Sequence, residues 1–195
     1  MRALVCSHSN SQKRIYLKNY IYFVITITHK RFPYFEEDIF CRLFIDDLLF
    51  CQELKKFELY AYTIMPNHVH LLIKLRGEYN ISRVMQSIKK EFSRDINYII
   101  AGDIPECRLQ GKQYSFRYKK QFYTISLGKY RQGFLQKYVQ SPSQFPHFRW
   151  QSSFRDRIIR DEKDLYNHLR YIENNYLKHG LEKNELSWSC YSKGG

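Results

Sequence analysis

The chain has 195 residues, of which 44% are hydrophobic and 26% charged, and its formal net charge is +13. The hydrophobic content is enough for a folded core and excludes a chain that is disordered throughout, and the length fits one domain. So large a positive surplus attracts polyanions, and nucleic acid is the commonest of these, although a merely soluble basic protein would have the same composition.

Cysteine spacing and hydropathy indicate the cellular compartment in which the protein is expected. The five Cys are scattered and form no CxxC pair, so neither a disulfide framework nor a thiolate zinc site is expected. No stretch approaches 18 consecutive apolar residues, and residues 1–14 lack the apolar run of a signal peptide. We therefore expect a cytoplasmic, nucleoid-associated protein without membrane contact, in which residues 1–14 are a flexible lead-in.

The first half of the chain alternates between strand and helix patterns. β-Branched and aromatic runs predict strands, and apolar side chains at a 3.6-residue period predict helices. In chain order these patterns give strand, helix, strand, strand and helix over residues 20–28, 36–56, 57–64, 68–75 and 81–99. Asn80 is a plausible N-cap of the second helix, and the turn MPN joins the last two strands as an antiparallel hairpin.

The second half is less regular. Residues 101–149 show no period, and Lys and Arg interleave there with many aromatic rings, which marks a basic aromatic insertion. A last helix is predicted over 161–179, with Asp161 as N-cap and Gly180 as the C′ residue.

The order of these elements favours an α+β fold. We expect an antiparallel sheet with helices packed on one face, of ferredoxin-like or RRM-like architecture. The domain is expected to span residues 15–182, with 101–149 as the insertion within it and 183–195 as a tail.

Two histidines on one strand carry the first chemical signal. Alternate side chains of a strand share a face, so His68 and His70 project together while Val69 and Leu71 line the other face. Two imidazoles so placed can ligate one divalent ion if a third ligand comes from elsewhere. The plainer alternative is a pair of surface histidines on a half-buried strand.

Three separated segments favour the chemical interpretation. The string YTIMPNHVHLLI resembles the His–hydrophobe–His (HUH) signature of REP-associated tyrosine transposases, a group within the single-tyrosine HUH transposases. Further on, FRWQSSFRDRIIRDEKDL and HLRYIENNYLKHGL resemble, in the same order, the WQ…F…IR stretch and the nucleophile segment of that family. The similarity extends over residues from about 15 to 100 and 149 to 182.

The resemblance implies that Tyr171 is the catalytic nucleophile and that the domain has the HUH fold. Asn175, four residues on, would share a helix face with Tyr171 and is the best candidate for a third metal ligand. The family has Pro after this Asn, whereas here Tyr176 follows, and the predicted helix therefore continues to about His179.

This chemistry would be metal-dependent cleavage and transfer of single-stranded DNA. A tyrosine hydroxyl is a poor nucleophile at its ordinary pKa of about 10. A divalent ion beside the phosphate stabilises the charge that develops there, and attack gives a 5′-phosphotyrosine and a free 3′-OH. Mg²⁺ or Mn²⁺ suits a mixed imidazole and amide-oxygen site that faces a phosphate, and zinc is less expected because Cys ligands are absent.

Single-stranded or hairpin DNA is the expected partner, because exposed bases stack on rings while Lys and Arg follow the backbone. The basic and aromatic residues expected to contact DNA lie near the tyrosine and in the insertion; they are Arg155, Arg157, Arg160, Lys178, Arg117, Lys119, Lys120 and Tyr118. Ordinary surface charge is the alternative for each.

Other functions remain open at this point. A non-catalytic nucleic-acid-binding protein with an RRM-like sheet would explain the charge and the rings but not the two histidines. A domesticated family member and a metal-dependent hydrolase would use the same residues. The sequence also leaves open a homodimer and an active site shared between its two chains.

Overall fold

Five strands form the central antiparallel sheet, in the order β6-β1-β3-β2-β7. The computed structural model describes residues 16–17, 19–102, 113–118, 121–138, 144–178 and 187–189. The strands of the sheet are β1 (Ile21–Ile27), β2 (Phe57–Met65), β3 (His68–Leu75), β6 (Arg155–Ile158) and β7 (Ser187–Ser189). Every neighbouring pair is antiparallel, and β2 and β3 form the expected hairpin.

Two long helices connect these strands, α1 (Asp38–Lys55) between β1 and β2 and α2 (Ile81–Ala101) after β3. Without β7, the strand order is the one that two interlocked βαβ units give, which is the ferredoxin-like arrangement. The predicted α+β class is therefore confirmed. Two 3-10 turns, His29–Arg31 and Tyr34–Glu36, lead from β1 into α1.

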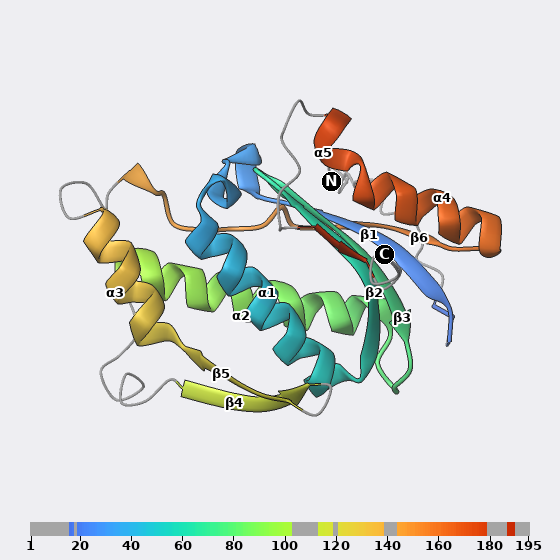
Figure 1. The fold of residues 1–195 in the computed structure, drawn as a ribbon, viewed down its shortest axis with the longest axis horizontal. Helices are drawn as coiled ribbons and strands as arrows, with labels where there is room; N and C mark the ends of the chain where they lie inside the picture. The colour runs from blue at the N-terminus through green and yellow to red at the C-terminus, as the bar shows by residue number, and fades with distance from the viewer. Residues whose placement is uncertain are drawn as a thin grey trace, which may run out of the picture.

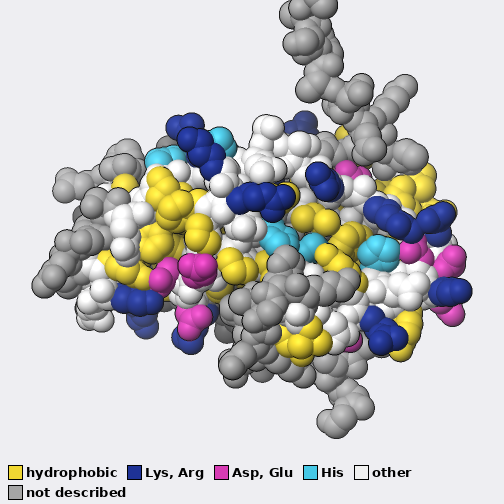
Figure 2. All heavy atoms as spheres, turned by 90° about the horizontal axis from the view of Figure 1, so that it is seen from above, with side chains coloured by type: hydrophobic (Ala, Val, Ile, Leu, Met, Phe, Trp, Pro, Cys, Tyr) yellow, Lys and Arg dark blue, Asp and Glu magenta, His cyan; other side chains and the backbone are white. Residues whose placement is uncertain are grey.

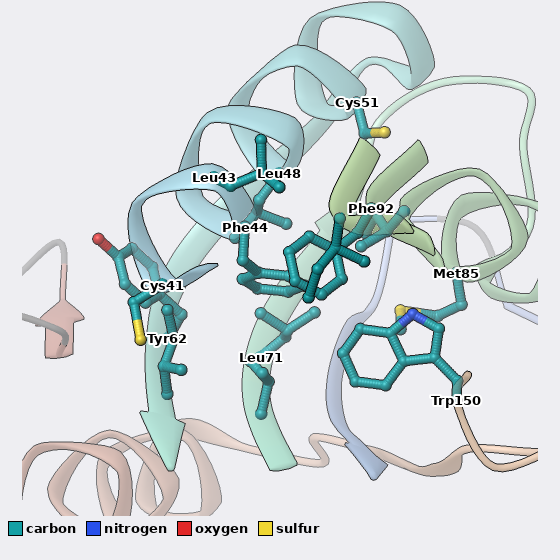
Figure 3. Packing of buried hydrophobic residues seen from close by; sticks show 14 of the residues in the cluster. Cys41, Leu43, Phe44, Leu48, Cys51, Tyr62, Leu71, Met85, Phe92 and Trp150 are labelled. Carbon is teal, nitrogen blue, oxygen red and sulfur yellow. The ribbon is translucent and has the colours of Figure 1, made fainter. Parts of the chain in front are cut away.

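The main core lies between the sheet and the helices α1 and α2. Val69 and Leu71 face it from β3, as the alternation predicts. Figure 3 shows Leu71 on the side of the sheet where the rings of Phe44 and Phe92 pack from the two helices. Cys41 and Cys51 are fully buried in α1, where they pack as small hydrophobic side chains.

The opposite face of the sheet is covered by α4 (Glu162–Glu173), which differs from the expectation of helices on one face only (Figure 1). Leu169 and Ile172 of this helix pack on Ala61 and Leu72, in a second cluster separate from the main core. These two sheet residues point away from α1 and α2, so they are buried only if another element lies on them. The sheet is thus enclosed on both sides, and the histidine face is one of the interior surfaces.

The insertion contains regular structure that its sequence did not reveal. It forms the hairpin of β4 (Gln113–Tyr118) and β5 (Gln121–Ser126), followed by α3 (Leu127–Lys137). Phe134 packs on Phe40, with ring centroids 5.6 Å apart, and Phe148 packs on Tyr34 at 4.8 Å. Several of its rings therefore belong to the main core rather than to a separate subdomain.

The terminal helix divides at Asn174, so the prediction of one helix over 161–179 is wrong in its C-terminal part. Asp161 is the N-cap, as predicted, and accepts a 2.7 Å hydrogen bond from the backbone N–H of Asp164. The Asn174 side chain donates to the Arg170 carbonyl at 2.9 Å, which ends α4 because it occupies a carbonyl of the last turn. The short helix α5 (Asn175–Lys178) follows, and Gly180 lies outside the described residues.

Residues 183–195 were predicted to be a tail, and three of them form β7 at the edge of the sheet beside β2. Within the described part of the chain, no helix is both long enough and apolar enough to cross a membrane.

Candidate active site

His68 and His70 lie on the face of β3 that is turned toward α4. Their rings converge to a centroid distance of 4.8 Å, although alternate residues of a strand are about 6.6–7 Å apart along the backbone. His70 is 2% exposed, and His68 is half-buried. The Nδ1 atom of His68 lies 2.8 Å from Oδ1 of Asn67. Because that oxygen can only accept, Nδ1 carries the proton and Nε2 carries the lone pair.

Tyr171 reaches this pair from α4. Its ring meets that of His70 edge-on, with centroids 5.3 Å apart. It also meets Phe23 of β1 at 5.8 Å, and Phe23 stacks on His70 at 5.6 Å. The predicted nucleophile and one of the predicted ligands, His70, about 100 positions apart in the sequence, are therefore brought together within one chain.

Asn175 begins α5, one residue after the break in the terminal helix. Its side chain is fully buried, and among the described residues neither its amide nitrogen nor its amide oxygen has a hydrogen-bonding partner. A buried amide without partners costs about 1–3 kcal/mol, so such a group is expected to have a ligand in the working protein. The break means that Asn175 does not continue the helix of Tyr171, contrary to the prediction.

Within the described residues, no three His, Cys, Asp or Glu side chains are arranged to hold a metal ion. The candidate ligand set is two imidazoles and one amide, and the buried, partnerless Asn175 amide makes this set chemically suitable for Mg²⁺ or Mn²⁺.

Arg155 lies in the same row as His70 across the sheet. Ile25 of β1 is opposite both His70 of β3 and Arg155 of β6, so all three side chains leave the sheet on the same face. Arg155 is exposed and stands two strands from His70, about 10 Å between Cα positions. Figure 2 views the molecule from the side of α4 and shows histidine side chains at the surface with Lys and Arg around them.

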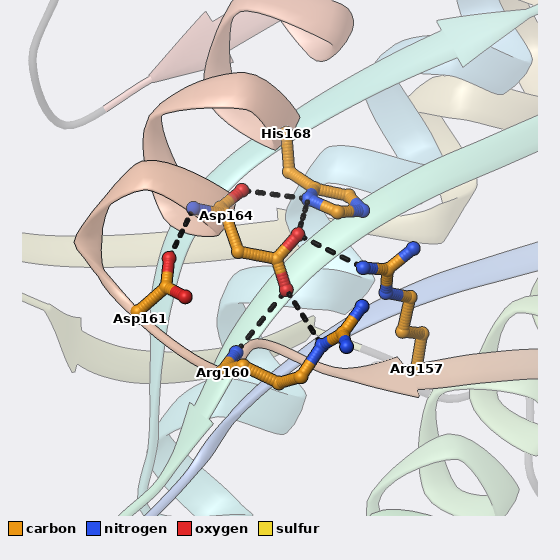
Figure 4. A network of polar contacts seen from close by, with 5 residues as sticks. All are labelled: Arg157, Arg160, Asp161, Asp164 and His168. Carbon is orange, nitrogen blue, oxygen red and sulfur yellow. Dashed lines mark hydrogen bonds and ion pairs between the residues drawn. The ribbon is translucent and has the colours of Figure 1, made fainter.

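Arg157 and Arg160 have a different environment, because both lie against Asp164 (Figure 4). Arg157 donates to the carboxylate at 3.1 Å, and the backbone N–H of Arg160 donates to it at 3.2 Å. Burial acts to raise the pKa of Asp164, but these hydrogen bonds and charges outweigh it, so the pKa lies below its ordinary value. Part of the positive charge predicted to contact DNA thus serves to fix the start of α4.

The other predicted DNA contacts are less defined. Arg117 and Tyr118 belong to β4 and Lys178 ends α5, but their side chains lie outside the described part. Lys119 and Lys120 lie outside the described residues altogether.

Two further residues of the site, Phe23 and His168, were not singled out from the sequence. The ring of His168 lies 4.7 Å from that of Phe23. His168 and Tyr171 are three positions apart in the sequence, and this spacing places both side chains on one side of the helix.

With this geometry described, the chain can be compared with known proteins. The sequence profile of the family described as "Transposase IS200 like" matches residues 16–142, which include both histidines. The chain belongs to this family. Tyr171 and Asn175 lie beyond the matched residues.

One curated relative agrees with the resemblance seen in the sequence. A protein of Haemophilus influenzae, described as a putative REP-associated tyrosine transposase, is 31% identical over 133 residues. The aligned part is 68% of this chain but only 56% of the relative, so the chain spans little more than half of that protein's length.

A solved structure supports the fold of this IS200-like chain. It is that of a REP-associated tyrosine transposase bound to a REP hairpin, with a TM-score of 0.60 and 18% identity. The match covers 92% of this chain and 82% of the other. At this identity the likeness shows a shared fold.

Proposed function

We propose that this IS200-like chain cleaves single-stranded DNA, in or beside a hairpin, and transfers the strand through a covalent intermediate on Tyr171. The observation that carries the proposal is the contact between Tyr171 and His70, at 5.3 Å between ring centroids, from two distant parts of the chain. A merely nucleic-acid-binding sheet would have no need to hold a phenol against a pair of converging imidazoles.

His68 and His70 would hold a divalent ion, Mg²⁺ or Mn²⁺, with the buried amide of Asn175 as the candidate third ligand. When bound, this ion would polarise the scissile phosphate and stabilise its developing charge. The hydrogen bond between His68 and Asn67 supports this role, because it orients the imidazole and fixes its tautomer.

The reaction uses the tyrosine oxygen as nucleophile. The Tyr171 oxygen attacks the phosphorus atom while the bond from phosphorus to the 3′ oxygen breaks. The phenol proton passes to solvent, and the leaving 3′ oxygen takes up a proton to become a hydroxyl. The product is a 5′-phosphotyrosine, and attack on it by the same or another 3′-OH restores a phosphodiester without ATP.

The basic surface of the active-site face would bind the strand. Arg155 lies in the same row as His70 and is exposed, so it is the side chain best placed to meet a phosphate that flanks the scissile one. The solved relative is bound to a REP hairpin, and a hairpin is therefore the DNA form that we propose for this chain as well.

One chain would suffice for the reaction. Tyr171 meets His70 of its own chain, so we infer an active site in cis rather than one shared between the two chains of a homodimer.

The test is a covalent DNA adduct. Hairpin DNA with single-stranded flanks is incubated with the protein and Mn²⁺ and analysed on a denaturing gel. We expect an adduct that EDTA prevents, and we expect Tyr171→Phe to abolish it while DNA affinity stays within about threefold, because the phenyl ring keeps its packing.

Tyr166→Phe is the matched control, since Tyr166 is on the same helix and 59% exposed, and it should form the adduct normally. An adduct that persists in Tyr171→Phe contradicts the assignment. Cleavage with turnover but no adduct indicates a hydrolase, and equal DNA binding with and without EDTA and no cleavage indicates a binding protein.

A further inference from the structure

Phe23 is the residue around which the candidate active site is packed. Its ring stacks on His70 at 5.6 Å and 20° and meets the edge of Tyr171 at 5.8 Å and 85°. Its third ring neighbour, at 4.7 Å, is His168. The position of Tyr171 over His70 therefore depends on how α4 is seated on Phe23.

His168 is the α4 residue whose ring contacts Phe23 beside Tyr171, while Leu169 and Ile172 pack the helix on the sheet. Its Nδ1 atom lies 2.7 Å from the backbone carbonyl oxygen of Asp164 and 3.3 Å from the Asp164 carboxylate. Because the carbonyl oxygen only accepts, Nδ1 carries the proton and donates to it, with the carboxylate as a nearby charge contact. The imidazole is 14% exposed, so its orientation is held by contacts on most sides.

Asp164 continues this connection into the sheet. Its carboxylate accepts from Arg157 of β6 at 3.1 Å, and Arg157 is opposite Phe23 on β1. Figure 4 shows the part of this connection that runs from Arg157 of β6 through Asp164 to His168. The contact of His168 with Phe23 and the pairing of Phe23 with Arg157 close it across the sheet. These contacts fix the rotation of α4 and its distance from β1, the strand that pairs with the histidine strand β3.

Helix geometry makes that rotation matter for Tyr171. Residues three apart on a helix are neighbours, and long side chains in helices lean toward the N-terminus. The Tyr171 ring is therefore carried over the turn that contains His168. A turn of α4 by a few degrees, or a shift of about 1 Å, displaces the phenol oxygen from the line of attack, and errors of this size cost about 100-fold in rate.

We propose that His168 is a positioning residue for Tyr171, and that it acts through the donor at Nδ1 and its contact with Phe23. This inference rests on the proposed function. It assigns no proton transfer to His168, and its predicted effect is on the rate of Tyr171 attack rather than on DNA affinity.

Three substitutions at one position test the proposal. Asn places an amide nitrogen where Nδ1 stands, Gln places one near Nε2, and Ala removes both. We expect His168→Ala to slow adduct formation at saturating DNA by about 10- to 100-fold, with the DNA dissociation constant changed less than about threefold. His168→Asn should recover most of the lost rate, and His168→Gln should not.

Asn167→Ala is the control, because Asn167 is an exposed neighbour on the same helix and should leave the rate unchanged. Thermal unfolding of each variant separates loss of rate from loss of folded protein. If His168→Ala does not fold, the comparison of Asn with Gln decides, since neither empties the site.

An unchanged rate in His168→Ala overturns the proposal, and so does a rate recovered by Gln but not by Asn, which would place the function on Nε2. Both results require wild-type protein that forms a Tyr171-dependent adduct. Wild-type protein without an adduct contradicts the proposed function instead.

Discussion

Asn175 is a buried polar residue whose burial is expected to cost stability. Its amide is fully buried and has no hydrogen-bonding partner among the described residues. An apolar residue of similar size would avoid the desolvation cost of that amide. A group kept at such a cost in a protein interior is expected to serve a ligand.

Replacement of this amide should therefore separate stability from ligand binding. Asn175→Leu is expected to raise the unfolding free energy of the metal-free protein by about 1 kcal/mol, because an unsatisfied amide is no longer buried. The same change should weaken Mn²⁺ binding by about 10-fold or more if the amide oxygen is a ligand.

Urea unfolding in EDTA measures the first quantity and titration with Mn²⁺ the second. Asn97→Leu is a contrasting variant, because Asn97 bonds to the carbonyl and the N–H of Phe148 and its replacement should destabilise the protein. Unchanged Mn²⁺ affinity in Asn175→Leu would remove Asn175 from the ligand set.

At the scale of elements, periodicity predicted the regular parts well. The strands β1, β2 and β3 and the helices α1 and α2 lie within two residues of the expected bounds. Each has a buried face of repeating apolar residues, which is the signal that a sequence displays locally. The four-residue strand β6 has the sequence Arg-Asp-Arg-Ile and no apolar face. It forms because its backbone pairs with the edge of β1, so its sequence alone could not reveal it.

The first turn of α4 leads to a prediction about pH. The pKa of Asp164 is lower in the folded protein than its ordinary value of 3.8, so the carboxylate stabilises the fold above about pH 4. That stabilisation is lost as the pH falls through the folded-state pKa. We expect Asp164→Asn to cost about 1–2 kcal/mol at pH 7 and much less at pH 3.

Urea unfolding at the two pH values measures this difference. Asp161→Asn is the control, because Asn caps a helix about as well as Asp and should change stability little at either pH. An equal cost of Asp164→Asn at both pH values would mean that its charge does not hold α4 in place.

At the scale of the whole molecule, the net charge of +13 is expected to set much of the affinity for DNA. Charge in general gives affinity without position, whereas a side chain at the active site also contributes to a defined contact. Arg155 is exposed on the active-site face, while Arg157 and Arg160 are engaged by Asp164. The three arginines should therefore contribute unequally, although the sequence presents them as equivalent.

This inequality can be measured from the salt dependence of binding. Arg155→Gln should reduce the slope of log affinity against log salt by about 0.7, the value for one phosphate contact to a single strand. Arg42→Gln removes the same charge from an exposed position on α1, on the far side of the sheet, and should change the slope far less. Equal slopes for the two variants would show that Arg155 makes no defined phosphate contact.

The sequence by itself determined the helices and strands that have a repeating apolar face and the shared face of His68 and His70. It also determined the family to which the chain belongs. Each of these follows from the types and the spacing of residues that are close together in the chain. The tertiary structure decided that α4 lies on the histidine side of the sheet, that the helix breaks before Asn175, and that Phe23 of β1 contacts both Tyr171 and His168. The position of α4 and the contacts of Phe23 depend on strand register and on segments far apart in the chain, and the spacing of neighbouring residues does not encode such contacts.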